Sequence, residues 1–244
     1  MRFERFCQRL RAVARYRRWP LLFFYADGKT ALDPAYPAAA EALENSRLPL
    51  LDLGCGMGLL AAYLRARGYE APILGLDADE KKIRIAQEAL AGTGVHFLAG
   101  DARGFPEHQG NVVMLDVLHY FDDAAQDALL RRIAASVAPG GMALLRISLN
   151  EPTWRFAMTR AEEWLIPYFR WIPWSGSNFP LRDEVCTPFR EAGFAEEIRP
   201  MWGWTPFNGY FFLFRRPGSV QAEVDFPAVR GSRAKPLQEV GNAP

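Results

Sequence analysis

The sequence predicts an α/β fold in which a parallel sheet is covered by helices on both faces. Two observations carry this prediction. Between residues 48 and 148, short apolar runs alternate with amphipathic helical segments. The first apolar run leads into a glycine cluster and then into a helical segment. This alternation is typical of β-α-β units, whose strands are parallel and whose helices pack on the sheet.

Seven short runs are expected to form strands. In chain order they span Leu48–Leu53, Ile73–Leu76, Val95–Leu98, Val112–Leu115, Met142–Ile147, Glu196–Met201 and Tyr210–Arg215. Four helices are expected among them, over Leu59–Arg67, Asp79–Leu90, Asp122–Val137 and Arg182–Ala192. Asp79 has the side chain of an N-cap residue, and Gly193 stops the last helix.

Length and composition indicate one domain with extensions. The 244 residues exceed the ~150 of a typical domain but fall short of two domains. Half of the residues are hydrophobic and 23% are charged, which excludes wholesale disorder. A net charge of +1 argues against a chain that binds polyanions as a whole. The expected parts are an N-terminal cap over 1–47, a domain over 48–216 with an insertion at 151–180, and a mobile tail over 217–244.

The first eighteen residues form a basic amphipathic helix, because seven arginines accompany apolar residues at helical spacing. Trp19-Pro20 is expected to end this helix, since proline disfavours the α conformation of the preceding residue. Three interpretations are open. The helix packs its apolar face on the sheet, touches an anionic membrane surface, or docks an acidic partner such as an acyl carrier protein.

Three features bear on location and metal content. The three cysteines are widely spaced and form no CxxC pair, so no metal site is predicted and a reducing compartment is favoured. The longest run of large apolar residues, Trp19–Ala26, is much shorter than the ~20 residues of a bilayer span. Arginines interrupt every candidate core of a signal peptide. A cytoplasmic protein is therefore expected.

The glycine-rich turn Leu51-Asp-Leu-Gly-Cys-Gly-Met-Gly58 is where ligand chemistry is expected to begin. Glycines let backbone N–H groups approach a ligand closely. The dinucleotide fingerprint GxGxxG would need a third glycine at Leu59, whereas the third glycine here is Gly58. Asp52 would repel a diphosphate but suits a cationic ligand. A purely structural turn is the alternative.

Two further acids and a second glycine-containing turn lie next to the predicted strands, where they could contact the same ligand. Asp77 ends the second strand, where a carboxylate can accept hydrogen bonds from ribose hydroxyls, and Asp101 follows the third, where it can accept from an adenine amine. An Ala-Pro-Gly-Gly turn at 138–141 precedes the fifth strand. The alternatives are a helix N-terminal charge for Asp77, a turn former for Asp101 and an ordinary loop for 138–141.

The segments LDLGCGMG, GLDAD, AGDARG, NVVMLDVLHYF and APGG together resemble class I S-adenosylmethionine-dependent methyltransferases. The resemblance covers residues 48–148, and 182–215 by pattern. It implies a Rossmann-like sheet of seven strands, the last antiparallel, and S-adenosylmethionine as cofactor. The residues it places around the cofactor are Asp52, Gly54, Cys55, Gly56 and Gly58 at the methionine part, Asp77 and Ala78 at the ribose, Asp101 and Ala102 at the adenine, and Asp116 and Val117 beside it.

His119 is the candidate catalytic base, because it follows a central strand and imidazole titrates near neutral pH. The alternative is a residue that only shapes the pocket, beside the substrate candidate Tyr120. Nucleic-acid adenine methylases are expected to carry an Asn/Asp-Pro-Pro-aromatic signature after strand four, and this stretch has no proline. No nucleic-acid substrate is therefore expected.

Residues 151–180 contain eight aromatic residues and are the expected substrate lid. Trp154, Tyr168 and Trp171 are its substrate candidates, and Tyr25 could approach the same mouth from the N-terminal side. Ordinary core packing or a dimer contact is the alternative.

A weaker resemblance concerns YRRWPLLFFYADGKTALDP and GWTPFNGYFFLFRR, which look similar to methyltransferases of aryl-polyene and xanthomonadin-type pigment synthesis. It implies a phenolic acceptor, free or carried on a protein. The expected function is methyl transfer to a small, aromatic or acyl-linked molecule. An NAD(P)-dependent oxidoreductase and a non-catalytic cofactor-binding partner protein are the alternatives.

Overall fold

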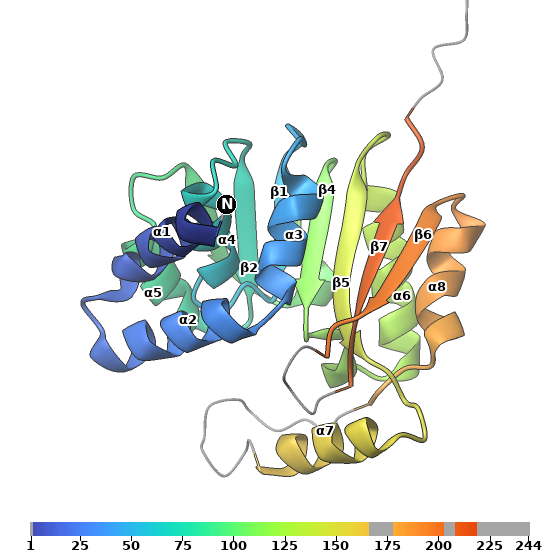
Figure 1. Ribbon diagram of the computed structural model, residues 1–244. Coiled ribbons are helices and arrows are strands. Elements are labelled where there is room, and N and C mark those ends of the chain that lie inside the picture. Colours follow the sequence, from blue (N-terminus) through green and yellow to red (C-terminus); the bar gives the residue numbers. More distant parts are fainter. Residues whose placement is uncertain (1, 166–177, 203–207, 219–244) are drawn as a thin grey trace, which may run out of the picture.

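The computed structural model describes residues 2–165, 178–202 and 208–218 and has one seven-stranded sheet in the order β3-β2-β1-β4-β5-β7-β6 (Figure 1). The strands are β1 Leu50–Leu53, β2 Ile73–Asp77, β3 Val95–Ala99, β4 Asn111–Leu115, β5 Met142–Ser148, β6 Ala195–Pro200 and β7 Gly209–Arg215. β1 to β5 pair in parallel, and β7 runs antiparallel to both β5 and β6. The predicted α/β class and the antiparallel last strand are confirmed.

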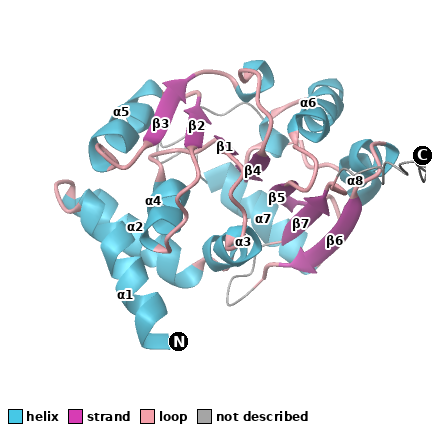
Figure 2. Cartoon of the chain, turned by 90° about the horizontal axis from the view of Figure 1, so that it is seen from above, coloured by secondary structure: helices cyan, strands magenta, loops and turns pink. Residues whose placement is uncertain are grey.

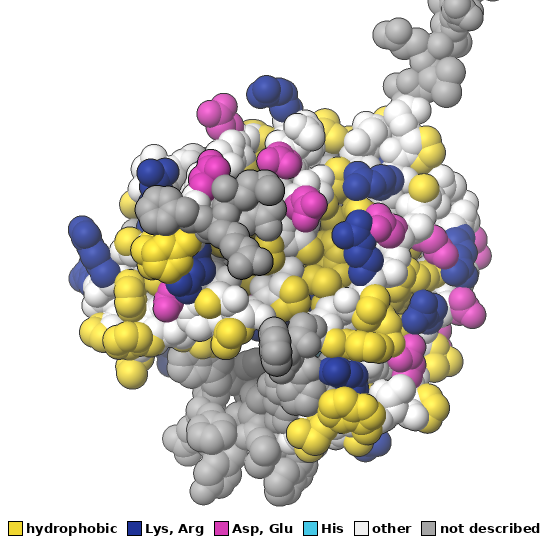
Figure 3. Space-filling view, in the orientation of Figure 1, with side chains coloured by type: hydrophobic (Ala, Val, Ile, Leu, Met, Phe, Trp, Pro, Cys, Tyr) yellow, Lys and Arg dark blue, Asp and Glu magenta, His cyan; other side chains and the backbone are white. Residues whose placement is uncertain are grey.

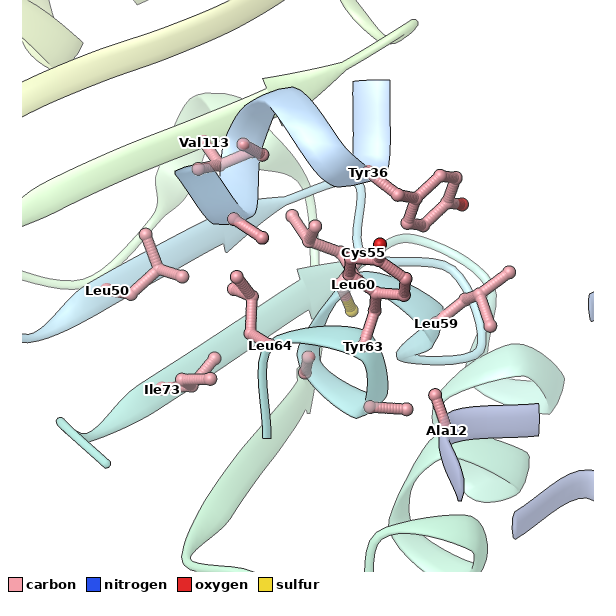
Figure 4. Close-up of a cluster of buried hydrophobic side chains, with 14 of the residues drawn as sticks. Ala12, Tyr36, Leu50, Cys55, Leu59, Leu60, Tyr63, Leu64, Ile73 and Val113 are labelled. Atoms are coloured by element: carbon pink, nitrogen blue, oxygen red, sulfur yellow. The ribbon is translucent and has the colours of Figure 1, made fainter. Parts of the chain in front are cut away.

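Two hydrophobic clusters cover the two faces of the sheet. Leu50 and Val113 point to one cluster, and their neighbours Leu51 and Val112 point to the other, as the alternation of strand side chains requires. The first cluster, part of which Figure 4 shows, includes residues of α3 Ala35–Leu43, α4 Leu59–Ala66 and α5 Glu80–Ala89. The second includes residues of α6 Asp123–Ser136 and α8 Arg182–Glu191. Figure 2 shows α4 and α6 on opposite sides of the sheet.

The predicted helix ends agree with the hydrogen bonds at those ends. The side chain of Asp79 accepts from the backbone N–H groups of Lys81 and Lys82, which confirms it as the N-cap of α5. The side chain of Asp122 accepts from the N–H of Ala125 at the start of α6. Gly193, just after α8, has the left-handed φ of 79° that favours glycine.

The N-terminal segment folds into α1 Arg2–Val13, a 3₁₀ turn at Ala14–Tyr16, α2 Pro20–Leu32 and α3. The basic helix ends at Val13, so the expectation that Trp19-Pro20 ends it is wrong. Pro20 is the first residue of α2, where proline fits because the N–H it lacks has no partner inside the helix. The apolar face of α1 packs mainly on α4 rather than on the sheet.

Hydrogen bonds and an ion pair fasten this cap. The buried hydroxyl of Tyr16 donates to the backbone oxygen of Met57, at 2.9 Å, within the glycine-rich turn. Burial raises the pKa of Tyr16, so the phenol stays protonated as the donor. Arg9 of α1 pairs with Asp27 of α2 at 2.5 Å. The cap is therefore joined directly to the turn that follows β1.

The insertion after β5 begins with α7 Trp154–Leu165, which lies at the edge of the sheet where β4 and β5 end (Figure 1). Tyr168 and Trp171 lie outside the described residues, as does most of the expected tail at 217–244. None of the helices in the described part of the chain combines the length and apolar character that a bilayer span requires.

Replacing Tyr16 by phenylalanine tests how the cap is held. Tyr16→Phe leaves the buried carbonyl of Met57 without its partner, so the free energy of unfolding should fall by about 1–2 kcal/mol. Trypsin should also cleave the cap faster in the folded protein. Tyr69→Phe is the matched control, because Tyr69 donates to the carbonyl of Leu48 at 2.6 Å, at the end of β1 opposite the glycine-rich turn. Equal rates of cap cleavage in the two variants would contradict the role of Tyr16.

Candidate active site

The glycine-rich turn passes between two neighbouring strand ends. The N–H groups of Gly54 and Cys55 both donate to the carbonyl of Leu76, at 2.7 and 3.0 Å, at the end of β2. On the β4 side, a Cβ added to Gly54 would lie 2.1 Å from Cγ2 of Val117. Gly54 also has a φ of +74°. Only glycine satisfies both constraints, so the turn lies against β2 and the residues after β4.

Asp77 organises the turn from the end of β2. One carboxylate oxygen accepts from the N–H of Gly56 at 2.8 Å, and the other accepts from the N–H of Asp79 at 2.9 Å. Ala78, between these two acids, is exposed. The structure therefore brings Asp77 to the glycines, as the sequence predicts, and adds a hydrogen bond that the sequence does not reveal. The ribose role of Asp77 stays a prediction.

Asp52 is a buried carboxyl group at the base of the turn, with a side chain only 3% exposed. One of its oxygens has no hydrogen-bond partner among the described residues. Burial, and secondarily the charge of Asp77, raise the pKa of Asp52 to about 7. A cationic group bound nearby would favour the charged carboxylate, so the turn suits a positively charged ligand.

Asp101 and Ala102 lie after β3, next to the end of β2. Asp101 caps the 3₁₀ turn Ala102–Gly104 and is paired with the guanidinium of Arg103, the closest approach being 2.5 Å. The hydrogen bonds from Arg103 hold the pKa of Asp101 below its usual value. Ala102 is buried. An adenine amine would therefore share this carboxylate with Arg103.

Asp116, after β4, belongs to a network of charges that the sequence does not predict. Its backbone has a left-handed φ of 59°, and its carboxylate accepts from Nε and Nη2 of Arg146, the Nε bond being 2.7 Å long. Arg146 also pairs with Asp33, which ends α2, and Lys29 lies 2.9 Å from Asp33. Burial raises the pKa of Asp33, but the charges of Arg146 and Lys29 outweigh it and hold that pKa low.

His119 and Tyr120 lie in the 3₁₀ turn Leu118–Tyr120 that follows β4. His119 is buried, its ring is 5.4 Å from that of Phe179 and nearly parallel to it, and Phe156 of α7 meets Phe179 edge-on. Burial lowers the pKa of His119 to about 4, so the imidazole is neutral at pH 7. These aromatic contacts join the end of β4 to the insertion.

The remaining substrate candidates lie on the helices flanking this edge. Tyr25 of α2 is 44% exposed and Trp154 of α7 is 64% exposed. The guanidinium of Arg155 lies between the rings of Trp154 and Trp202, at 4.6 and 4.7 Å from their centres. Among the described residues, no three His, Cys, Asp or Glu side chains gather as a metal site.

The sequence of the central part matches a known family. Residues 50–141 match the family model described as a methyltransferase domain. A ubiquinone biosynthesis O-methyltransferase from Sinorhizobium medicae (strain WSM419) is 34% identical over 143 residues, 56% of this chain and 54% of the relative. The protein of the same description from Yersinia pestis (strain Pestoides F) is 30% identical over 120 residues, 46% of this chain and 48% of the relative. The chain spans about half the length of the curated relatives it matches.

Solved structures share the fold. Magnesium protoporphyrin IX methyltransferase from Synechocystis PCC 6803 with bound SAH has a TM-score of 0.58 at 19% identity, over 74% of this chain and 81% of that one. Mitomycin 7-O-methyltransferase has a TM-score of 0.59 at 21% identity, over 75% of this chain and 53% of that one. These findings support the resemblance to class I S-adenosylmethionine-dependent methyltransferases: residues 50–141 match a methyltransferase domain, and the chain shares its fold with a methyltransferase solved with bound SAH.

The raised pKa of Asp52 predicts an unusual effect of pH on stability. The folded protein keeps the proton of Asp52 up to about pH 7, whereas the unfolded chain loses it near pH 4, so wild-type stability falls across this window. Asp52→Asn lacks this loss, and in urea unfolding at pH 8 it should be more stable than the wild type by roughly 2–4 kcal/mol. The difference should vanish near pH 4.

Asp101→Asn is the control for this experiment, because the pKa of Asp101 is shifted in the opposite direction. It should gain no stability at pH 8. A gain for Asp52→Asn that is the same at pH 4 and pH 8 would show that its carboxyl group does not titrate as inferred.

Proposed function

We propose that this chain transfers a methyl group from S-adenosylmethionine to a small acceptor molecule. The observation that carries the proposal is the glycine-rich turn between β2 and Val117, with the unpartnered buried oxygen of Asp52 beneath it. A carboxyl group without a partner at a backbone turn fits a ligand that brings a positive charge and hydrogen-bond donors. The match of residues 50–141 to a methyltransferase domain supports the same conclusion.

We assign the residues of the site to parts of the cofactor as follows. Asp52 and the turn from Gly54 to Gly58 would hold the methionine part, Asp77 the ribose and Asp101 the adenine. Asp116 and Val117 would lie beside the cofactor. When bound, S-adenosylmethionine supplies an activated methyl group on a sulfonium, so the protein mainly has to orient an acceptor and exclude water. Arg146 keeps the carboxylate of Asp116 in place for this role.

The acceptor atom we propose is a hydroxyl oxygen of a small aromatic molecule. Two of the curated relatives are described as ubiquinone biosynthesis O-methyltransferases, which supports a hydroxyl acceptor. Tyr25, Tyr120 and Trp154 supply aromatic surface on elements around the edge where the turn lies. A phenol carried on a protein, as in aryl-polyene or xanthomonadin-type pigment synthesis, remains part of the proposal. His119 is the proposed base that takes the hydroxyl proton.

Binding of S-adenosylhomocysteine, measured by calorimetry, tests the cofactor site first. The wild type should bind with micromolar affinity. Asp77→Ala should bind ~10-fold more weakly or worse, because it removes a carboxylate that fixes the N–H of Gly56. Asp127→Ala is the control, since Asp127 lies on α6 in an exposed pair with Arg131. Binding of NADH in place of S-adenosylhomocysteine would restore the oxidoreductase alternative.

The base role of His119 predicts both a mutational and a pH effect. His119→Ala should lower turnover ~10²–10⁴-fold and leave the affinity for S-adenosylhomocysteine unchanged. Because burial lowers the pKa of His119 to about 4, its protonation should not slow the reaction between pH 8 and pH 5.5. Phe179→Leu removes the neighbouring ring but keeps the imidazole, and serves as the control. Near-normal turnover of His119→Ala would make His119 a pocket wall.

A further inference from the structure

The outward face of α2 is apolar, which is unusual for a surface helix. Leu21, Phe24 and Leu32 are 84%, 71% and 71% exposed, whereas Ala26 and Thr30 on the same helix are buried. The exposed residues follow helical spacing, with Gly28 completing the row, and a Cβ on Gly28 would meet no atom within 4 Å. These four positions form a stripe of apolar or missing side chains, here called the α2 stripe.

A surface helix normally presents polar side chains to water and apolar side chains to the core. The α2 stripe reverses this arrangement. The neighbouring helix α1 extends the apolar surface, because Phe6 and Leu10 are 48% and 40% exposed. Large apolar side chains gathered on an exposed surface are typical of an interaction site. Figure 3 shows hydrophobic side chains collected on the side of the molecule that α1 and α2 form.

Positive charge borders the α2 stripe. Residues 1–18 contain seven arginines and one acidic residue, and Arg17 and Arg18 directly precede the start of α2. Arg11, Arg15 and Arg17 are exposed. Arg18 pairs with Glu88 at 3.0 Å, but within the described ranges no acidic side chain forms an ion pair with Arg11 or Arg17. The surface therefore combines exposed apolar side chains with two arginines, Arg11 and Arg17, that form no ion pair with the described part of the chain.

We propose that the α1–α2 surface binds the face of an anionic lipid bilayer. The α2 stripe would enter the boundary between headgroups and acyl chains, and Arg11 and Arg17 would contact lipid phosphates. An acidic protein would also satisfy the arginines. However, Leu21, Phe24 and Leu32 are each more than two-thirds exposed, so such a protein would need a pocket matched to each of them. A bilayer buries such a row of side chains without a matched pocket, so the surface favours lipid.

The position of the stripe relates it to the candidate active site. Asp33, the residue just after α2, is paired with Arg146, and Arg146 holds Asp116. α7, on the same edge of the sheet, exposes Trp154 and Met158 by 64% and 45% (Figure 1). A bilayer bound to α2 would lie near this edge and offer it apolar acceptors. That consequence rests on the proposed function, whereas the binding of the bilayer does not.

Co-sedimentation of the full chain with lipid vesicles tests the proposal. The wild type should sediment with vesicles of equal parts phosphatidylcholine and phosphatidylglycerol, less with phosphatidylcholine alone, and less at high salt. The double variant Leu21→Ser/Phe24→Ser should bind ~10-fold more weakly or worse, because burying each side chain contributes to affinity. Arg17→Glu should bind the anionic vesicles about 10-fold more weakly and the neutral vesicles as the wild type does.

Two matched controls separate this surface from general effects. Leu98→Ser removes an exposed leucine of β3, and Arg47→Glu reverses an exposed arginine just before β1, at the other edge of the sheet. Both should bind vesicles like the wild type, and all variants should keep the wild-type melting temperature. Failure of the wild type to sediment with anionic vesicles would overturn the proposal. So would equal binding by wild type and stripe variants, or capture of an acidic carrier protein through Leu21 and Phe24 without vesicle binding.

Discussion

The close approach of the Gly54 backbone to Val117 is the constraint on which the site depends. β1 lies between β2 and β4, so the chain leaving β1 must pass two neighbouring strand ends at once. On the β2 side, the N–H groups of Gly54 and Cys55 donate to the carbonyl of Leu76. On the β4 side, Gly54 has no side chain that would clash with Val117. This packing fixes where the backbone N–H of Gly56 meets Asp77.

The aspartates around this turn have pKa values shifted in opposite directions, because some lie beside cations and Asp52 does not. Asp33 and Asp116 share the guanidinium of Arg146, and Lys29 adds a second cation beside Asp33, so these acids are compensated within the protein. Asp52 is buried with only the charge of another acid nearby, which makes its ionisation costly. Of Asp33, Asp52 and Asp116, only Asp52 has no ion pair within the described residues, and it lies beneath the glycine-rich turn. This distribution suits a ligand that carries its own positive charge.

The sequence was informative where a local pattern decides the structure and uninformative where distant residues do. Apolar runs and regular alternation predicted all seven strands, and Asp79 was recognisable as an N-cap, because these signals lie within a few residues. α2 was missed because Trp19-Pro20 equally suits a helix end and a helix start. The partners of Arg146 lie 30 and 113 residues away. A lone arginine in an apolar strand was the available signal, but it names no partner.

The way α2 is held connects the charges of the site to the exposed surface. Leu22 and Phe23 pack against the core, but Leu21, Phe24 and Leu32 do not. Polar contacts also attach this segment: Asp27 pairs with Arg9 of α1, and Asp33, just after α2, pairs with Arg146 of β5. Because Arg146 also binds Asp116, a displacement of α2 would alter the charge that faces Asp116 beside the glycine-rich turn. The outward apolar residues and the inward charges thus lie on two faces of one helix, and the inward charges are the contacts through which α2 reaches Arg146 and Asp116.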